Sequence, residues 1–187
     1  MMTLRNRGSS IVAQLALLVG FFAAYAATEE PPIQHARGAA LLAPFKTNLQ
    51  QALREGLAEG ATEAVGACRI EAPEIAAKRS HDGIRVGRTS HRLRNPANTA
   101  PDWVKPVLDG FAADPSDRTP KSRALPSGRV GYVEAIVTQP LCLTCHGDAL
   151  APDVAERITS LYPEDRAVGY RAGDLRGVFW VEFPSAD

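Results

Sequence analysis

The residues with the clearest chemistry are the two cysteines and the histidine of the stretch CLTCH, Cys142, Cys145 and His146. A Cys-x-x-Cys pair can serve thioredoxin-like redox chemistry when it follows a strand in a βαβ unit, or can form half of a closed zinc site. When a histidine follows directly, the same pair is typical of haem c attachment, in which both thiols form thioethers with the haem vinyl groups and the histidine binds the iron. No βαβ pattern and no second close cysteine pair is evident, so the sequence predicts one covalent haem c per chain, held by Cys142 and Cys145 and ligated by His146.

The second axial ligand of that iron is a separate question. Methionine is a common partner of histidine in cytochromes, but the chain has only Met1 and Met2, both in a segment that we interpret below as a leader. Cys68 lies in the apolar stretch AVGACRIEA, and an unpaired thiol in an oxidising compartment usually has a role. Cys68 is therefore the favoured ligand, although a buried, inert thiol is the alternative. The other candidates are an open position, a lysine and three histidines: His35, His81 and His91.

Residues 1–26 have the three-part pattern of a secretory signal peptide. Arg5 and Arg7 precede an almost uninterrupted apolar run, and Ala24-Tyr25-Ala26 fits a small-x-small cleavage site. An uncleaved N-terminal anchor is the alternative, because the apolar run is nearly long enough to span a bilayer. In either case we expect the remainder in the periplasm or another oxidising, extracytoplasmic space, where haem-maturation machinery would be a partner.

The rest of the chain is expected to form a linker over 27–39 and a single domain over 40–187. Apolar residues at helical spacing predict two N-terminal helices, the second with Val65, Cys68, Ile70 and Ile75 facing inward. Runs of Val, Ile, Tyr and Phe predict strands, and the order of elements favours an α+β fold with an antiparallel sheet. The expected helices are 35–58, 62–79, 102–111 and 152–162, and the expected strands are 83–90, 129–140 and 177–184. Residues 114–128 are expected to be a loop.

Four blocks of the sequence resemble the Tll-type c-haem-binding domain family, in the order that the family has them. They are ACRIEAPEIAAKRS (67–80), VGRTSHRLRNPANTAPDW (86–103), PLCLTCHG (140–147) and YRAGDLRGVFWVEFP (170–184). The resemblance covers residues 40–184 and implies a PAS-like antiparallel sheet with long N-terminal helices packed beside it. It also implies a single haem c on the two motif thiols, with His146 and Cys68 as axial ligands. His91 departs from the family pattern, so a histidine remains a competitor for the axial position.

Several polar side chains are candidates for contact with the haem propionates. Guanidinium groups pair well with carboxylates, which favours Arg88 and Arg94, with Asn95 beside them in the same block. Tyr170 and Arg176 are weaker candidates on the same reasoning. The alternative for the whole block is a solvated loop shaped by its Asn-Pro turn.

Two functions fit these expectations. The first is a haem-based redox or gas sensor that passes its signal to a protein partner, with a diatomic gas as the ligand that replaces Cys68. The second is a low-potential periplasmic electron-transfer cytochrome. No acid–base pair is evident, which argues against an enzyme, and the equal counts of 21 basic and 21 acidic residues argue against a nucleic-acid partner.

Overall fold

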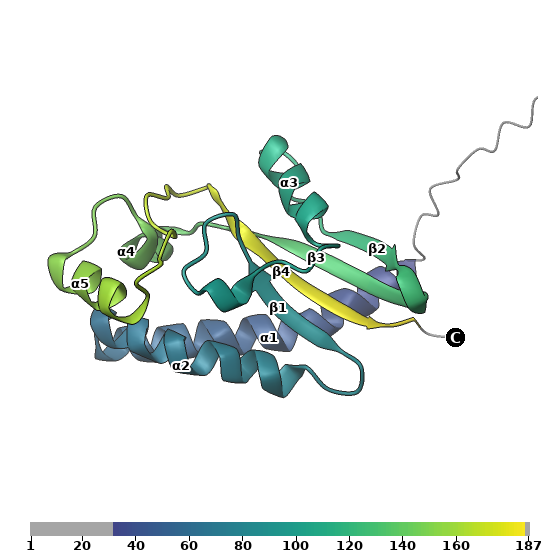
Figure 1. The fold of residues 1–187 in the computed structure, drawn as a ribbon, viewed down its shortest axis with the longest axis horizontal. Coiled ribbons are helices and arrows are strands. Elements are labelled where there is room, and N and C mark those ends of the chain that lie inside the picture. The colour runs from purple at the N-terminus through teal and green to yellow at the C-terminus, as the bar shows by residue number, and fades with distance from the viewer. Residues whose placement is uncertain (1–31, 186–187) are drawn as a thin grey trace, which may run out of the picture.

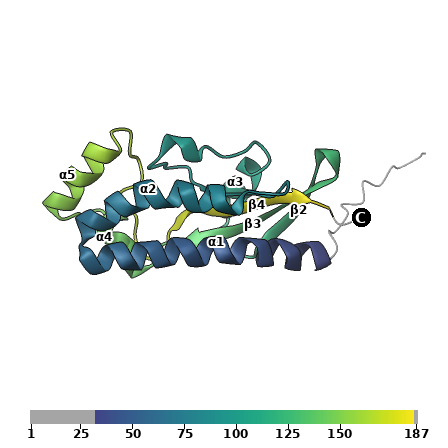
Figure 2. The ribbon, with the colours of Figure 1, turned by 90° about the horizontal axis from the view of Figure 1, so that it is seen from below.

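Two long helices form one side of the protein. The computed structural model describes residues 32–185, in which α1 (Pro32–Glu59) and α2 (Ala61–Arg79) are joined at Gly60. Gly60 has a φ of 146°, a conformation that residues with a Cβ rarely adopt, so the helix breaks there and the chain turns back. The two helices lie side by side along one face of the sheet (Figures 1 and 2). Pro44 and Pro73 both lie inside helices without ending them.

Helix α1 begins earlier than the sequence pattern predicts. The linker expected over 27–39 is helical from Pro32, three residues before the expected start of the helix at 35. This first turn packs on the sheet, since the ring of His35 meets the ring of Tyr132 edge-on at 4.9 Å. The expected signal peptide, 1–26, lies outside the described residues. Among residues 32–185, no helix is both long enough and apolar enough to cross a membrane.

A four-stranded antiparallel sheet lies against these helices. It contains β1 (Arg85–Thr89), β2 (Lys121–Leu125), β3 (Arg129–Val137) and β4 (Leu175–Pro184), in the order β1-β4-β3-β2. Side chains of β4 alternate between its two faces, as expected for a strand covered on both sides. Val181 and Phe183 pack with Leu42 and Phe45 of α1, whereas Val178 and Trp180 pack on the opposite face.

The remaining helices lie on the second face and at one end of the sheet. Helix α3 (Lys105–Ala113) buries Val107, Leu108 and Phe111 against that second face. The short helix α4 (Leu143–His146) and helix α5 (Pro152–Leu161) gather at one end, next to the junction of α1 and α2 (Figure 1). This end of the molecule therefore carries the Cys-x-x-Cys-His motif. Single turns of 3-10 helix occupy Pro96–Asn98, Pro126–Gly128 and Pro140–Cys142.

The structure confirms the predicted α+β class, the antiparallel sheet and the N-terminal helices beside it. Two further details of the prediction are wrong. Strand β2 lies in the segment expected to be a loop, and it completes the sheet through its pairing with β3. Ile70 faces outward and is 64% exposed, because the buried side of α2 follows Ala64, Val65 and Ala72 instead.

Candidate functional site

The Cys-x-x-Cys-His motif forms a compact helical turn at the end of β3. The backbone N–H of Cys142 donates to the carbonyl of Gln139 at 2.9 Å, and α4 follows at once. Gly147 then ends this turn with its N–H bonded to the Leu143 carbonyl at 3.0 Å, and a Cβ there would lie 2.7 Å from that oxygen. The motif is thus fixed by its own backbone. Cys68, Cys142 and Cys145 are all free thiols and all partly buried.

The side chain of His146 is oriented by the segment that precedes β4. Its Nδ1 lies 2.6 Å from the carbonyl oxygen of Ala167, a residue with no exposed surface. Since a carbonyl only accepts, Nδ1 of the neutral ring carries the proton and Nε2 carries the lone pair. The backbone adds a second contact, because the N–H of Tyr170 donates to the His146 carbonyl at 2.9 Å. Burial, with smaller effects from the charges of Arg176 and Arg94, lowers the pKa of His146 to about 2, so the ring is neutral at ordinary pH.

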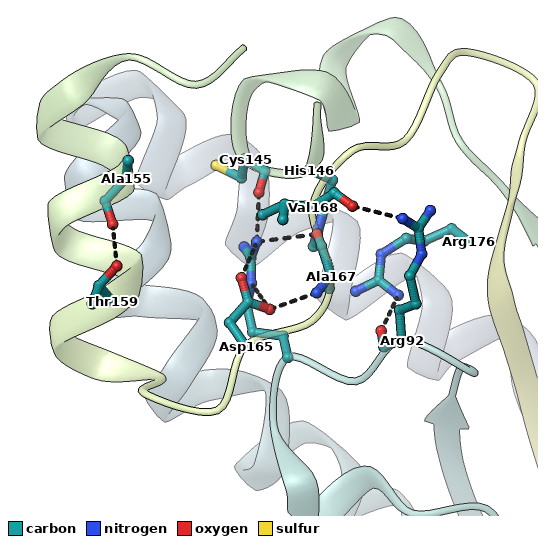
Figure 3. Close-up of polar contacts among 10 residues, drawn as sticks. Arg92, Cys145, His146, Ala155, Thr159, Asp165, Ala167, Val168 and Arg176 are labelled. Atoms are coloured by element: carbon teal, nitrogen blue, oxygen red, sulfur yellow. Dashed lines mark hydrogen bonds and ion pairs between the residues drawn. The ribbon is translucent and has the colours of Figure 1, made fainter. Parts of the chain in front are cut away.

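Arg94 joins the motif to the same segment. Its guanidinium pairs with both carboxylate oxygens of Asp165, at 3.2 and 3.3 Å, and these side chains are 13% and 8% exposed. The same group donates to the carbonyl of Cys145 at 2.5 Å and to that of Ala167 at 3.4 Å. Figure 3 shows Cys145, Asp165 and Ala167 gathered around these contacts. Arg94 therefore holds the motif and the His146 acceptor together.

Cys68 reaches this end of the molecule on helix α2. That helix contacts both α4 and α5, and an apolar cluster of Val65, Val154 and Ile158 packs against Cys145 and Tyr162. Burial raises the pKa of the Cys68 thiol, and the nearby positive charges of Arg88 and Arg94 partly offset this. The Cys68 charge in turn contributes to the raised pKa of the Cys145 thiol, whose largest cause is burial. The structure thus brings the third cysteine to the motif from about seventy residues away in the sequence.

Two further guanidinium groups at this site, those of Arg88 and Arg176, form no ion pair with a carboxylate among residues 32–185. The side chain of Arg88 makes no hydrogen bond or ion pair with any residue in the described range 32–185, and burial lowers its pKa. Arg176 has a buried Nε without a partner, and one weak contact of 3.5 Å from Nη1 to the carbonyl of Arg92. Burial lowers the pKa of Arg176 to about 10. A buried guanidinium without a carboxylate is costly, so this site is electrostatically suited to an anionic ligand.

The other predicted site residues lie elsewhere or have structural contacts. Asn95 accepts the N–H of Ala97 at 3.0 Å and caps the turn at Pro96–Asn98. His91 is exposed and pairs with Asp109 of α3 at 2.7 Å. Within residues 32–185, no three His, Cys, Asp or Glu side chains gather closely enough to hold a metal ion by themselves. A closed zinc site, which needs four such ligands, is therefore not formed in this part of the chain.

Sequence reasoning missed Asp165 and Ala167. Asp165 orders the segment by accepting the N–H of Ala167 at 2.8 Å while it pairs with Arg94. Its only signal in the sequence was a carboxylate in a polar stretch after a helix, which is common. The contribution of Ala167 is a backbone carbonyl, which no residue type reveals.

The fold and this site define a single α+β unit with a Cys-x-x-Cys-His motif and a third thiol beside it. The model of the Tll0287-like family matches residues 25–184, so the chain belongs to the Tll0287-like family. Among solved structures, the crystal structure of the cyanobacterial heme-protein Tll0287 is similar, with 26% sequence identity and a TM-score of 0.59. That alignment covers 84% of this chain and 98% of the other. No curated protein matches this chain.

Proposed function

We propose that this protein is an exported, c-type haem protein with one haem, attached through Cys142 and Cys145 and ligated by His146 and Cys68. The observation that carries the proposal is the packing of α2 against α4 and α5, together with the proximity of Cys68 to the motif, where its charge contributes to the raised pKa of the Cys145 thiol. The relative Tll0287 is described as a heme-protein, and membership of its family supports haem as the cofactor here. The sequence supports a covalent linkage, because both thiols and the histidine have the spacing that is typical of haem c attachment.

The residues around the motif fit such a group. The Nδ1–H of His146 is engaged by Ala167, so Nε2 is the nitrogen available to iron, as in most metal-bound histidines. Arg88 and Arg176 offer uncompensated positive charge for two propionate carboxylates. Arg94 is a weaker choice for a propionate than the sequence suggests, because most of its donors are already taken by Asp165 and two carbonyls.

A bound haem would supply a one-electron couple and, where an axial ligand leaves, a binding position for a diatomic gas. The thiolate of Cys68 is an anion and favours ferric over ferrous iron, so we expect a low reduction potential. Release of Cys68 on reduction would free α2 at this point. Because α2 packs along α1, such a release could change the helix pair that a partner protein would contact, which is how a two-state sensor works.

The sensor is the function that we favour, with an extracytoplasmic location and a protein partner that receives the signal. A low-potential electron-transfer cytochrome is the second candidate, and the exposed Leu141 and Val168, at 53% and 38%, support it. These apolar side chains flank Cys142 and Ala167, where a redox partner could approach. We propose no enzymatic activity, since no acid–base pair is evident in the sequence, and no nucleic-acid partner, since 21 basic residues balance 21 acidic residues.

Magnetic circular dichroism of the ferric protein tests the ligand assignment. We expect thiolate–imidazole ligation that is lost in Cys68→Ala and retained in Ile70→Ala, a control on the exposed side of the same helix. An unchanged spectrum in Cys68→Ala would contradict the assignment. After reduction, carbon monoxide binding at the Cys68 position supports the sensor, whereas retention of both ligands in both oxidation states supports the electron carrier.

A further inference from the structure

A cavity of about 320 Å³ lies beside the proposed haem site, between the end of β1, helix α3 and the segment that leads into β4. Its volume is at the lower end of the range for small-molecule sites. No cysteine lines it, and neither do His146, Arg88 or Arg94. Tyr170 lines the cavity and also meets the His146 ring edge-on at 6.3 Å. The cavity is thus separate from the motif, and its lining residue Tyr170 contacts the motif histidine.

Arg118 lines the cavity in a fixed position. Its Nη1 donates to the carbonyls of Phe111, Asp114 and Asp117 at 2.8, 3.0 and 2.9 Å, which secures the guanidinium at the end of α3. The Nε and Nη2 of Arg118 have no partner among residues 32–185. The side chain is therefore held in place with donors to spare, as a preorganised anion ligand should be.

Arg92 provides a second cation on the wall formed by Tyr170. Its guanidinium carbon lies 3.7 Å from the centre of the Tyr170 ring, and its Nη1 donates to the Val168 carbonyl at 2.8 Å. Ser90 contacts both residues, since its Oγ accepts the backbone N–H of Arg92 at 3.1 Å and lies 3.3 Å from the Tyr170 hydroxyl. Figure 3 shows Arg92 next to Val168 and Arg176. These contacts therefore hold Arg92 and Tyr170 in position in the absence of a ligand.

The remaining lining residues narrow the ligand class. Leu108, Ala112, Pro115 and Leu175 provide apolar surface, and Asp174 is the one carboxylate in the lining. The Asp174 carboxylate already accepts the N–H of Arg171 at 2.7 Å. The lining thus has two guanidinium groups and a single carboxylate, which already accepts a hydrogen bond, so it favours an anionic ligand. The apolar surface favours an anion that also has a hydrocarbon part.

We propose that this cavity binds a small organic carboxylate, with Arg118 and Arg92 as its polar ligands and the apolar residues around its carbon chain. The planar fork of a guanidinium matches a carboxylate in a bidentate contact. The inference goes beyond the proposed haem chemistry and does not depend on it, because every group that it uses lies outside the motif.

Isothermal titration calorimetry of the purified holoprotein tests the proposal, with acetate, succinate and benzoate as carboxylate probes and inorganic phosphate as the competing anion. We expect one-to-one binding of at least one carboxylate at millimolar concentration or tighter, and weaker binding of phosphate. Arg118→Gln should weaken carboxylate binding about tenfold, whereas Arg123→Gln, an exposed arginine on β2, should leave it unchanged. Failure of all three carboxylates to bind overturns the proposal, as does equal binding of phosphate.

A second variant keeps the test valid if Arg118→Gln disturbs α3. Ala112→Phe adds a ring to the cavity wall on the exposed side of α3, and we expect it to abolish carboxylate binding while the circular dichroism spectrum stays unchanged. Full carboxylate affinity in a folded Ala112→Phe protein overturns the cavity assignment. The haem content of each sample, read from its absorbance, reports separately on the proposed haem chemistry.

Discussion

The Nδ1 of His146 lies 2.6 Å from the carbonyl oxygen of Ala167. This contact joins the motif after β3 to the segment before β4, and it decides which ring nitrogen of His146 is available to a metal. The contact depends on Asp165, which accepts the Ala167 N–H and pairs with Arg94. The orientation of the motif histidine is therefore a property of a three-residue arrangement outside the motif.

Asp165→Asn should destabilise this arrangement. The substitution leaves the largely buried Arg94 without its anionic partner, and breaking a buried ion pair costs about 3 kcal/mol in the free energy of unfolding. Urea denaturation followed by circular dichroism measures the change. Glu164→Gln is the matched control, because it alters an exposed neighbouring carboxylate. Equal stability of the two variants would show that the Arg94–Asp165 pair does not support the site.

Arg88→Gln should lower the reduction potential of the haem. Removing a buried positive charge near Cys68 stabilises the ferric state relative to the ferrous state. We expect a decrease of the order of 60 mV, which corresponds to about 1.4 kcal/mol for one electron. Spectroelectrochemical titration gives the value, with Arg123→Gln as a control on the exposed edge strand. A potential that does not move, or that rises, contradicts the proposal that Arg88 lies beside the haem.

Ile158→Ala should weaken the packing of α5 on α2. Ile158 is 3% exposed and belongs to the apolar cluster next to Cys145, and truncation of such a side chain costs about 3 kcal/mol of stability. Thr159→Ala changes an exposed residue of the same helix and should have little effect. If chemical denaturation gives the two variants the same midpoint, α5 does not depend on this contact.

The sequence predicted the secondary-structure elements in which apolar residues repeat at helix spacing or cluster in strand-like runs. Apolar spacing predicted both N-terminal helices, and Val- and Phe-rich runs predicted β3 and β4. Strand β2 was missed because Lys121–Leu125 has no apolar alternation, and as an edge strand it depends on pairing with β3. The three-residue turn at Pro126–Gly128 between the two strands was the available hairpin signal.

Part of the candidate site could likewise be predicted from the sequence, and part could not. The motif and Cys68 were predicted from residue type, and the structure places them at one end of the molecule. The role of Arg94 was not predictable, because its contacts with Asp165 and with two carbonyls arise from tertiary packing. Asn95 similarly caps its own turn. Charge complementarity identifies candidate ligands for an anion, but only the fold shows which donors are already engaged.

The central claim is that Cys142 and Cys145 hold one haem covalently. Intact-mass spectrometry under denaturing conditions tests it most directly, on protein exported together with the haem-maturation machinery. We predict that the wild-type chain and a Thr144→Ala control retain the mass of one haem, and that Cys142→Ala/Cys145→Ala retains none. A wild-type chain without bound haem, or a double variant that keeps it, would contradict the claim.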